Sequence, residues 1–136
     1  MPDLYVLMSH SLSPGQEGEA RERFLINRVI YPPEKLKNYF SGVPPENELD
    51  LPILYQMTNW IQSISRRGDI VLVQGEYGIT FFLVDFCLKN GLVPIYASSH
   101  REYRENPGKD GSVVRHHRFR HVTLRHYQSW KPLKKE

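Results

Sequence analysis

The chain lacks the features that mark secreted and membrane-embedded proteins. Cys87 is its only cysteine, so an internal disulfide framework is excluded and a reducing compartment is indicated. No apolar run reaches the roughly 18–20 residues that a membrane-spanning helix needs. The N-terminus shows no basic region followed by an apolar one, so we expect no signal peptide. Together these absences predict a cytoplasmic protein without membrane contacts.

Two common phosphate-binding motifs are also missing. The glycine turn at residues 75–78 does not follow the GxGxxG pattern of dinucleotide-binding folds, and no Gly-Lys-Ser/Thr sequence completes a P-loop.

The net charge of +3 permits an anionic ligand but does not require nucleic acid. The length of 136 residues points to one domain, which we assign to residues 1–128, followed by a charged tail at 129–136.

What the chain does contain is a strand, a glycine turn and an apolar helix in direct succession. Residues 70–73 form an unbroken aliphatic run, typical of a central parallel strand that is covered on both faces. The turn that follows has two glycines at 75 and 78, and a buried helix with Cys87 as a core thiol is expected over about 79–89. In open α/β sheets, ligands bind at the carboxyl ends of such strands.

Periodicity and capping signals predict the remaining elements. Ser13, Pro14 and Gln16 have the pattern of a capping box, which predicts a polar helix over residues 14–24. Further helices are expected at 33–40 and 51–66, and further strands at 4–8, 28–31, 92–97 and within 112–127. We therefore predict an α/β fold, with a mostly parallel, Rossmann-like sheet flanked by helices and an antiparallel C-terminal edge.

Polar residues follow three of the predicted parallel strands, at the point where each strand ends. They are Ser9, His10 and Ser11 after the first strand; Gln74, Gly75, Glu76, Tyr77 and Gly78 after the central strand; and Ser98, Ser99, His100 and Arg101 after the strand at 92–97. Because the carboxyl ends of parallel strands meet at one edge of a sheet, we expect the three clusters to converge on one site.

Each group in this predicted site has a chemical use and a plainer explanation. Backbone N–H groups at Gly75 and Gly78 can cradle a phosphate at a helix N-terminus, or the glycines can simply allow a tight turn. Glu76 would repel a phosphate there, so we expect it to face a ribose hydroxyl or the outside. His10 can donate to a phosphate or transfer a proton, or it can be a surface residue. Arg101 can pair with a phosphate or with a neighbouring glutamate.

The C-terminal segment 115–127 holds four arginines and four histidines in thirteen residues. Three interpretations stay open: a metal site, a solvated basic edge, or positive charge beside an anion site or subunit contact. A metal site would use His116, His117, His121 and His126. Adjacent histidines on a strand point to opposite faces and no acidic residue or cysteine is interleaved, so we predict no metal.

Four stretches together resemble a known family. They are the Ser-His pair at 9–10 with Leu-x-x-x-Gln after it, the turn at 74–78, and residues 94–102 and 119–127. In these stretches the chain is similar to the smallest stand-alone Csx-type CRISPR ancillary proteins, which are single Rossmann-like domains related to the CARF sensors. That family commonly has Gln-Gly-Asp-Phe-Gly at the turn and Thr-Thr-Lys-Arg after the fourth strand. Here His100 replaces the lysine, which removes a permanent charge.

The resemblance implies a role in type III CRISPR immunity. Related proteins bind cyclic oligoadenylate second messengers, and those called ring nucleases cleave them and so switch the response off. It also implies a CARF-type fold and a homodimer with the cyclic ligand across the two-fold axis. We expect no cofactor and no stable binding of linear nucleic acid.

The residues of the predicted site suit a metal-independent cleavage of such a ring, in which a ribose 2′-OH attacks the adjacent phosphodiester. We predict that His10 stabilises a phosphate or transfers a proton. We predict that Arg101 stabilises the negative charge of the transition state. The predicted substrate contacts are Ser9, Ser11, Gln74, Gly75, Glu76, Tyr77, Gly78, Ser98, Ser99 and His100. Three other functions stay open: a protein that binds the messenger without cutting it, an enzyme for a small phosphorylated substrate, and an RNA-binding protein.

Overall fold

Five strands form one sheet in the order β2-β1-β3-β4-β5. The computed structural model describes residues 1–108, 111 and 113–134, without the side chains of 101–107 and 113–119. The strands are β1 (Leu4–Leu7), β2 (Val29–Ile30), β3 (Ile70–Val73), β4 (Val93–Pro107) and β5 (Val113–His126). β1 runs parallel to β2 and β3, β3 runs parallel to β4, and β4 pairs with β5 antiparallel. The predicted α/β class, mostly parallel sheet and antiparallel C-terminal edge are confirmed.

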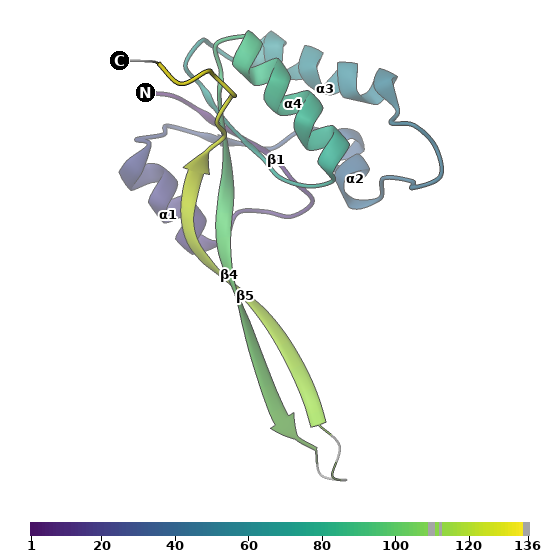
Figure 1. Ribbon diagram of the computed structural model, residues 1–136. Coiled ribbons are helices and arrows are strands. Elements are labelled where there is room, and N and C mark those ends of the chain that lie inside the picture. The colour runs from purple at the N-terminus through teal and green to yellow at the C-terminus, as the bar shows by residue number, and fades with distance from the viewer. Residues whose placement is uncertain (109–110, 112, 135–136) are drawn as a thin grey trace.

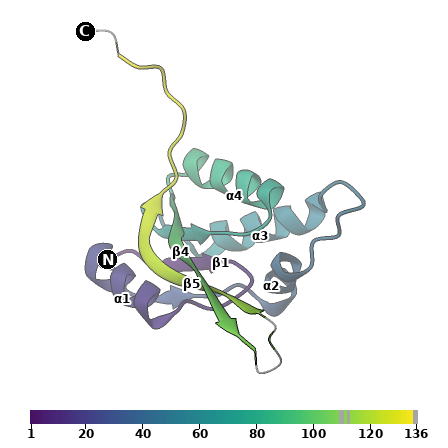
Figure 2. The same cartoon turned by 60° about the horizontal axis from the view of Figure 1, so that its bottom comes forward.

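Helices cover both faces of the sheet. They are α1 (Pro14–Arg23), α2 (Glu34–Ser41), α3 (Leu51–Ile64) and α4 (Tyr77–Lys89). α1 lies on one face, whereas α2, α3 and α4 gather on the other (Figure 1, Figure 2). The order of elements along the chain is the predicted one. Across the described residues, the helices are too short or too polar for any of them to cross a membrane.

The two central strands are buried on both faces, as their unbroken aliphatic runs predict. All residues of β1 and β3 are buried. Alternate residues of β1 divide between the faces, since Leu4 and Val6 pack with Ala20 of α1 while Tyr5 packs with the other three helices. Cys87 of α4 is fully buried, and burial raises the pKa of its thiol to about 12. The prediction of a core thiol is confirmed.

Two buried carboxylates join the amino ends of β1 and β3. Asp69 accepts hydrogen bonds from the backbone N–H groups of Asp3 and Arg66, at 3.1 and 2.8 Å. Asp3 in turn accepts a hydrogen bond from the Arg28 guanidinium at 2.9 Å, which lowers the pKa of the Asp3 carboxyl. Burial, assisted by the Asp69 charge, raises the pKa of Tyr5 to about 12. This network fixes the sheet edge opposite the predicted site.

The first residues of two helices show how far capping signals in the sequence predict where a helix begins. α1 begins where predicted, and the Ser13 and Gln16 side chains form the capping box with distances of 3.2 and 3.0 Å. α4 begins at Tyr77, two residues earlier than predicted, because the Glu76 side chain caps it. Glutamate is not a preferred N-cap residue, so no capping signal marked this start.

β4 is much longer than predicted. It runs to Pro107, whereas the predicted strand ends at Ala97. Ser98, Ser99, His100 and Arg101 therefore lie inside a strand, and the prediction that they follow a strand end is wrong. The second half of β4 pairs with β5 in a two-stranded arm that projects from the sheet (Figure 1). A register shift between Ser98 and Ser99 places a β-bulge at the base of the arm. The predicted turn at 106–111 is described only in part, since residues 109–110 lie outside the described range.

Candidate functional site

The carboxyl ends of β1 and β3 lie side by side, as their predicted parallel pairing requires. The backbone N–H of Gln74 donates to the Leu7 carbonyl at 3.1 Å. Ser9, His10 and Ser11 follow β1 at this edge and all three are exposed. The Ser9 hydroxyl oxygen and His10 Nδ1 are 3.4 Å apart. The polar clusters at 9–11 and 74–78 therefore follow neighbouring strands at the same edge of the sheet. The His10 imidazole is exposed there and accessible to a ligand.

The turn after β3 does not form the expected phosphate cradle. Oε1 of Glu76 accepts a hydrogen bond from the Ile79 N–H at 2.9 Å and so occupies the N-terminus of α4. A carboxylate in this position satisfies the helix N–H and repels a second anion. Glu76, which we expected to face a ribose hydroxyl or the outside, is exposed and also caps its own helix. The same carboxylate disfavours a phosphate at Gly75 and Gly78, and their contacts with a substrate stay predictions.

Close packing explains the two glycines of the turn. Neither has a positive φ, so neither is needed for a left-handed backbone. A Cβ at Gly75 would lie 3.3 Å from Cδ1 of Phe40, and a Cβ at Gly78 would lie 2.8 Å from Cδ1 of Leu49. α2 and the loop before α3 thus press against the turn, which leaves its other side to face β4.

β4 joins the site through the residues at the base of the arm. The Gln74 side-chain oxygen accepts a hydrogen bond from the Ala97 N–H at 2.9 Å, which places these two residues at the same level. Ser98 and Ser99 come directly after Ala97, half-buried and exposed respectively. Their hydroxyls are thus attached to backbone that adjoins the turn.

His100 and Arg101 stand further out on the arm. His100 is exposed and pairs in register with Arg120 of β5. Arg101 pairs in register with Phe119, and its side chain lies outside the described part of the chain. A strand rises about 3.3 Å per residue, so the Arg101 backbone is roughly 13 Å beyond the level of Ala97. The fold therefore does not bring the Arg101 backbone to the glycine turn.

One carboxylate holds β5 against α1. Glu19 accepts hydrogen bonds from the Leu124 N–H at 2.8 Å and the Thr123 hydroxyl at 3.0 Å, and it pairs with His121 Nε2 at 2.8 Å. Burial acts to raise the pKa of Glu19, but these hydrogen bonds and one from Arg23 outweigh it and lower that pKa. His121 thus serves to position the strand.

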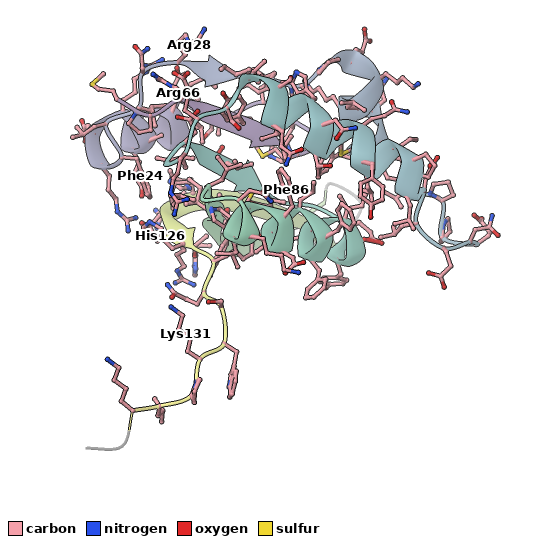
Figure 3. The ribbon with its side chains drawn as sticks, turned by 90° about the horizontal axis from the view of Figure 1, so that it is seen from above. Phe24, Arg28, Arg66, Phe86, His126 and Lys131 are labelled. Atoms are coloured by element: carbon pink, nitrogen blue, oxygen red, sulfur yellow. The ribbon has the colours of Figure 1, made fainter. Side chains whose placement is uncertain are left out.

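The histidines of the 115–127 segment that the structure describes have separate partners. His121 pairs with Glu19, whereas the His126 ring lies 5.3 Å from the Phe24 ring, centroid to centroid (Figure 3). Among residues 1–108, 111 and 113–134, no described group of three or more His, Cys, Asp or Glu could hold a metal ion. The side chains of His116 and His117, which complete the predicted set, lie outside that description.

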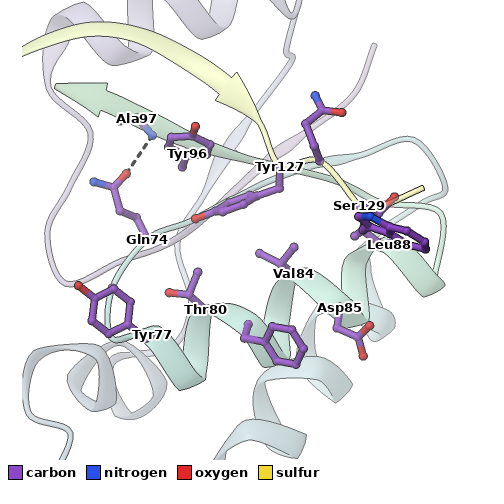
Figure 4. Close-up of a pocket in the computed structure, with 14 residues that line it drawn as sticks. Gln74, Tyr77, Thr80, Val84, Asp85, Leu88, Tyr96, Ala97, Tyr127 and Ser129 are labelled. Carbon is purple, nitrogen blue, oxygen red and sulfur yellow. Dashed lines mark hydrogen bonds between the residues drawn. The ribbon is translucent and has the colours of Figure 1, made fainter. Parts of the chain in front are cut away.

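A pocket of about 710 Å³ opens on the α4 side of the same turn (Figure 4). It lies between α4 and the chain that follows β5, and its aromatic lining includes Tyr77, Phe81, Tyr96, Tyr127 and Trp130. Trp130 belongs to the segment that we predicted as a tail. The turn thus has a polar edge beside β1 and an apolar pocket beside α4.

Sequence reasoning missed most of this pocket because it treated α4 as buried all round. Ile79, Leu83 and Cys87 are buried, but Phe81 on the opposite side is 76% exposed. A largely apolar helix is typical of a buried element, so the sequence of α4 carried no signal for the pocket.

Residues 2–125 of the chain match the model of the family described as "Uncharacterized protein MJ1673". The chain belongs to this family. A relative with the same description, from Methanocaldococcus jannaschii, is 29% identical over 130 residues, which cover 96% of this chain and 100% of the relative. No solved structure matches the chain. The description of the MJ1673 family names no ligand and no reaction, so the chemistry has to be inferred from the residues themselves.

Proposed function

We propose that the protein is a metal-independent ring nuclease that binds and cleaves cyclic tetraadenylate, and so switches off type III CRISPR signalling. The observation that carries the proposal is the parallel pairing of β1 with β3, because the exposed His10 follows β1 and the Gln74 turn follows β3 at the same edge of the sheet. The Csx-type resemblance supplies the identity of the messenger. The proposal includes a CARF-type Rossmann fold, a homodimer with the ring on its two-fold axis, and a cytoplasmic location.

In the proposed reaction, a ribose 2′-oxygen attacks the neighbouring phosphorus while the bond from phosphorus to the next 5′-oxygen breaks. The 2′-OH loses its proton and the departing 5′-oxygen gains one, so the product is a linear chain that ends in a cyclic 2′,3′-phosphate. His10 acts in one of these proton transfers or donates to a phosphate oxygen, because imidazole changes its charge near neutral pH. The Ser9, Ser11 and Gln74 side chains hold the ribose for in-line attack.

Positive charge for the phosphates has to come from side chains, because Glu76 occupies the N-terminus of α4. We assign this role to Arg101, with Ser98, Ser99 and His100 as further contacts along the base of the arm. A macrocycle contacts several protein groups at once, so a guanidinium on the arm can stabilise charge on a phosphate that lies away from the turn.

A second candidate is a protein that binds the ring without cutting it. Two observations favour it: the helix N-terminus is filled by Glu76, and the Arg101 backbone stands beyond the sheet edge at which His10 lies. No anion hole is therefore assembled around His10 in advance, whereas sequestration needs only affinity.

The test is to incubate the purified protein with cyclic tetraadenylate and to separate the products by chromatography. We expect a linear product with a cyclic 2′,3′-phosphate, at a rate that EDTA does not change. H10A and R101A should each slow single-turnover cleavage by on the order of 10²-fold or more. H126A and R21A are matched controls, because they remove a histidine and an arginine elsewhere on the surface, and they should retain the wild-type rate.

Each outcome separates the alternatives. A ring that stays bound but intact after long incubation rejects the nuclease and supports the sequestering protein. No binding to a ring of any size rejects both. Wild-type cleavage by both H10A and R101A would remove the site assignment even if the ring is cut.

A further inference from the structure

The pocket beside the turn has an aromatic lining that the proposed reaction does not use. On α4, Tyr77 and Phe81 are four residues apart and so share one side of the helix, and they are 91% and 76% exposed. Across the pocket stand Tyr96 and Tyr127, with Trp130, which is 86% exposed, at the rim. Large aromatic side chains are rarely left this exposed in one place without a partner.

One wall of the pocket is fixed in advance. The Tyr127 hydroxyl donates to the Val73 carbonyl at 2.6 Å, at the carboxyl end of β3. The Tyr96 and Tyr127 rings are in contact, with centroids 4.7 Å apart and an angle of 47° between the ring planes. A rigid aromatic wall needs little reordering when a flat ligand stacks against it, which favours binding.

The charges around the pocket indicate what kind of ligand fits. None of its described lining residues is Lys, Arg or His, and Asp85 is the one charged group among them. The Asp85 carboxylate pairs with Lys89 at 2.9 Å. A phosphate gains nothing from such a lining, whereas an uncharged planar ring gains stacking and apolar contact. The volume of about 710 Å³ lies within the range of small-molecule sites.

We propose that this pocket is a base-binding subsite, which takes an adenine ring of the same ligand whose phosphate lies at the sheet edge. The inference rests on the proposed function, since it names the part of the cyclic oligoadenylate that the pocket holds. Gln74 and Tyr77 connect the two places, because both line the pocket and their turn leaves the sheet at the same edge as the segment with His10. A base and its phosphate are adjacent parts of one nucleotide, and the turn has the apolar pocket on its α4 side and the polar residues 9–11 at its edge of the sheet.

The test measures the affinity for cyclic tetraadenylate by calorimetry in F81A and W130A. Both side chains are mostly exposed, so the fold should tolerate the changes. Stacking of one base on an aromatic side chain predicts binding that is about 5- to 150-fold weaker in each variant. The cleavage rate at saturating ligand should stay near the wild-type value, because stacking acts equally on the ground and transition states. Y55A removes an exposed aromatic side chain of α3, 56% exposed and outside the pocket, and should bind normally.

The outcomes distinguish this inference from the proposed function. If the wild type binds the ring and both variants bind it within twofold of the wild type, the base subsite is wrong and the proposed function stands. If the wild type binds no ring, the proposed function fails and the subsite fails with it. If light scattering shows that F81A or W130A converts a dimer into a monomer, the aromatic face is a subunit contact, which overturns the subsite.

Discussion

Replacing Glu19 with alanine should destabilise the fold by about 2–4 kcal/mol, because this carboxylate holds β5 against α1. The substitution leaves the Leu124 N–H and the Thr123 hydroxyl without the acceptor that lies 2.8 and 3.0 Å away. It also removes the contact between the carboxylate and His121 Nε2 at 2.8 Å. A hydrogen bond to a charged group contributes about 1.5–3 kcal/mol, and the site is only 20% exposed, so water replaces the lost partner poorly. The midpoint of thermal unfolding should fall by on the order of 10 °C.

The effect should also depend on pH. The folded-state pKa of Glu19 is lower than its ordinary value of 4.5, so its stabilisation is complete above that pH and is lost as the pH falls through the folded-state pKa. The difference between wild type and E19A should therefore be constant near neutral pH and shrink below about pH 4.5. Urea unfolding can be followed by the fluorescence of Trp60, whose ring lies 5.9 Å from the buried Tyr5 ring.

E17A is the matched control, because it removes a carboxylate of α1 that pairs only with Arg21 among the described partners. Side chains of that pair are 44% and 48% exposed, so the change should stay within about 0.5 kcal/mol. If E19A unfolds at the same urea concentration as E17A, Glu19 does not hold β5 against α1. The same conclusion follows if the loss of stability in E19A does not shrink at acid pH.

Three further predictions concern the scaffold. G18A should stabilise the protein by about 0.5–1 kcal/mol in urea unfolding, because Gly18 lies within α1 and an added Cβ meets nothing within 4 Å. G91A should destabilise it by about 1–2 kcal/mol in the same assay, since Gly91 has φ +72° and an added Cβ would lie 2.9 Å from Cγ of Arg67. The Cys87 thiol, with its pKa raised to about 12 by burial, should resist a thiol reagent at pH 8 until denaturant is added; rapid labelling of the native protein would contradict this.

The parts of the fold that could be predicted are those in which burial and capping leave marks on residue types. The aliphatic run 70–73 is typical of a strand that is covered on both faces. The capping-box pattern of Ser13 and Gln16 indicated the start of α1. Gly91 similarly marked the end of α4, where its φ of +72° is one that glycine adopts readily.

The arm could not be predicted, because its strands are held by backbone pairing while their residue types are mostly polar. Hydrophobic periodicity reports which face is buried, and residues 98–107 have no such period. Pairing with β5 nevertheless continues after the register shift, from Ser99 to Pro107. For this reason the predicted strand stops at Ala97 and the third polar cluster follows it. For the same reason the sequence predicts Arg101 near the turn, whereas its backbone lies further out on the arm.

The site was predicted in outline but not in its chemistry. Parallel strand order was enough to place the segment with His10 and the turn with Gln74 at the same edge of the sheet. The role of Glu76 depends on one rotamer that brings its carboxylate onto the Ile79 N–H, and residue type alone does not determine this. The aromatic pocket depends on where the chain after β5 runs, which no local pattern indicates.

The position of β5 gives the basic segment a physical role. β5 is one edge of the sheet along Val113–His126, whereas the opposite edge, β2, has only two residues. An open edge presents unpaired backbone groups that can recruit a strand from another molecule, and natural proteins discourage this with charged residues. The sequence of β5 carries four arginines along residues 115–125, which is a residue type found on such edges. The sequence of β5 is therefore of the kind that discourages edge-to-edge pairing between copies of a protein.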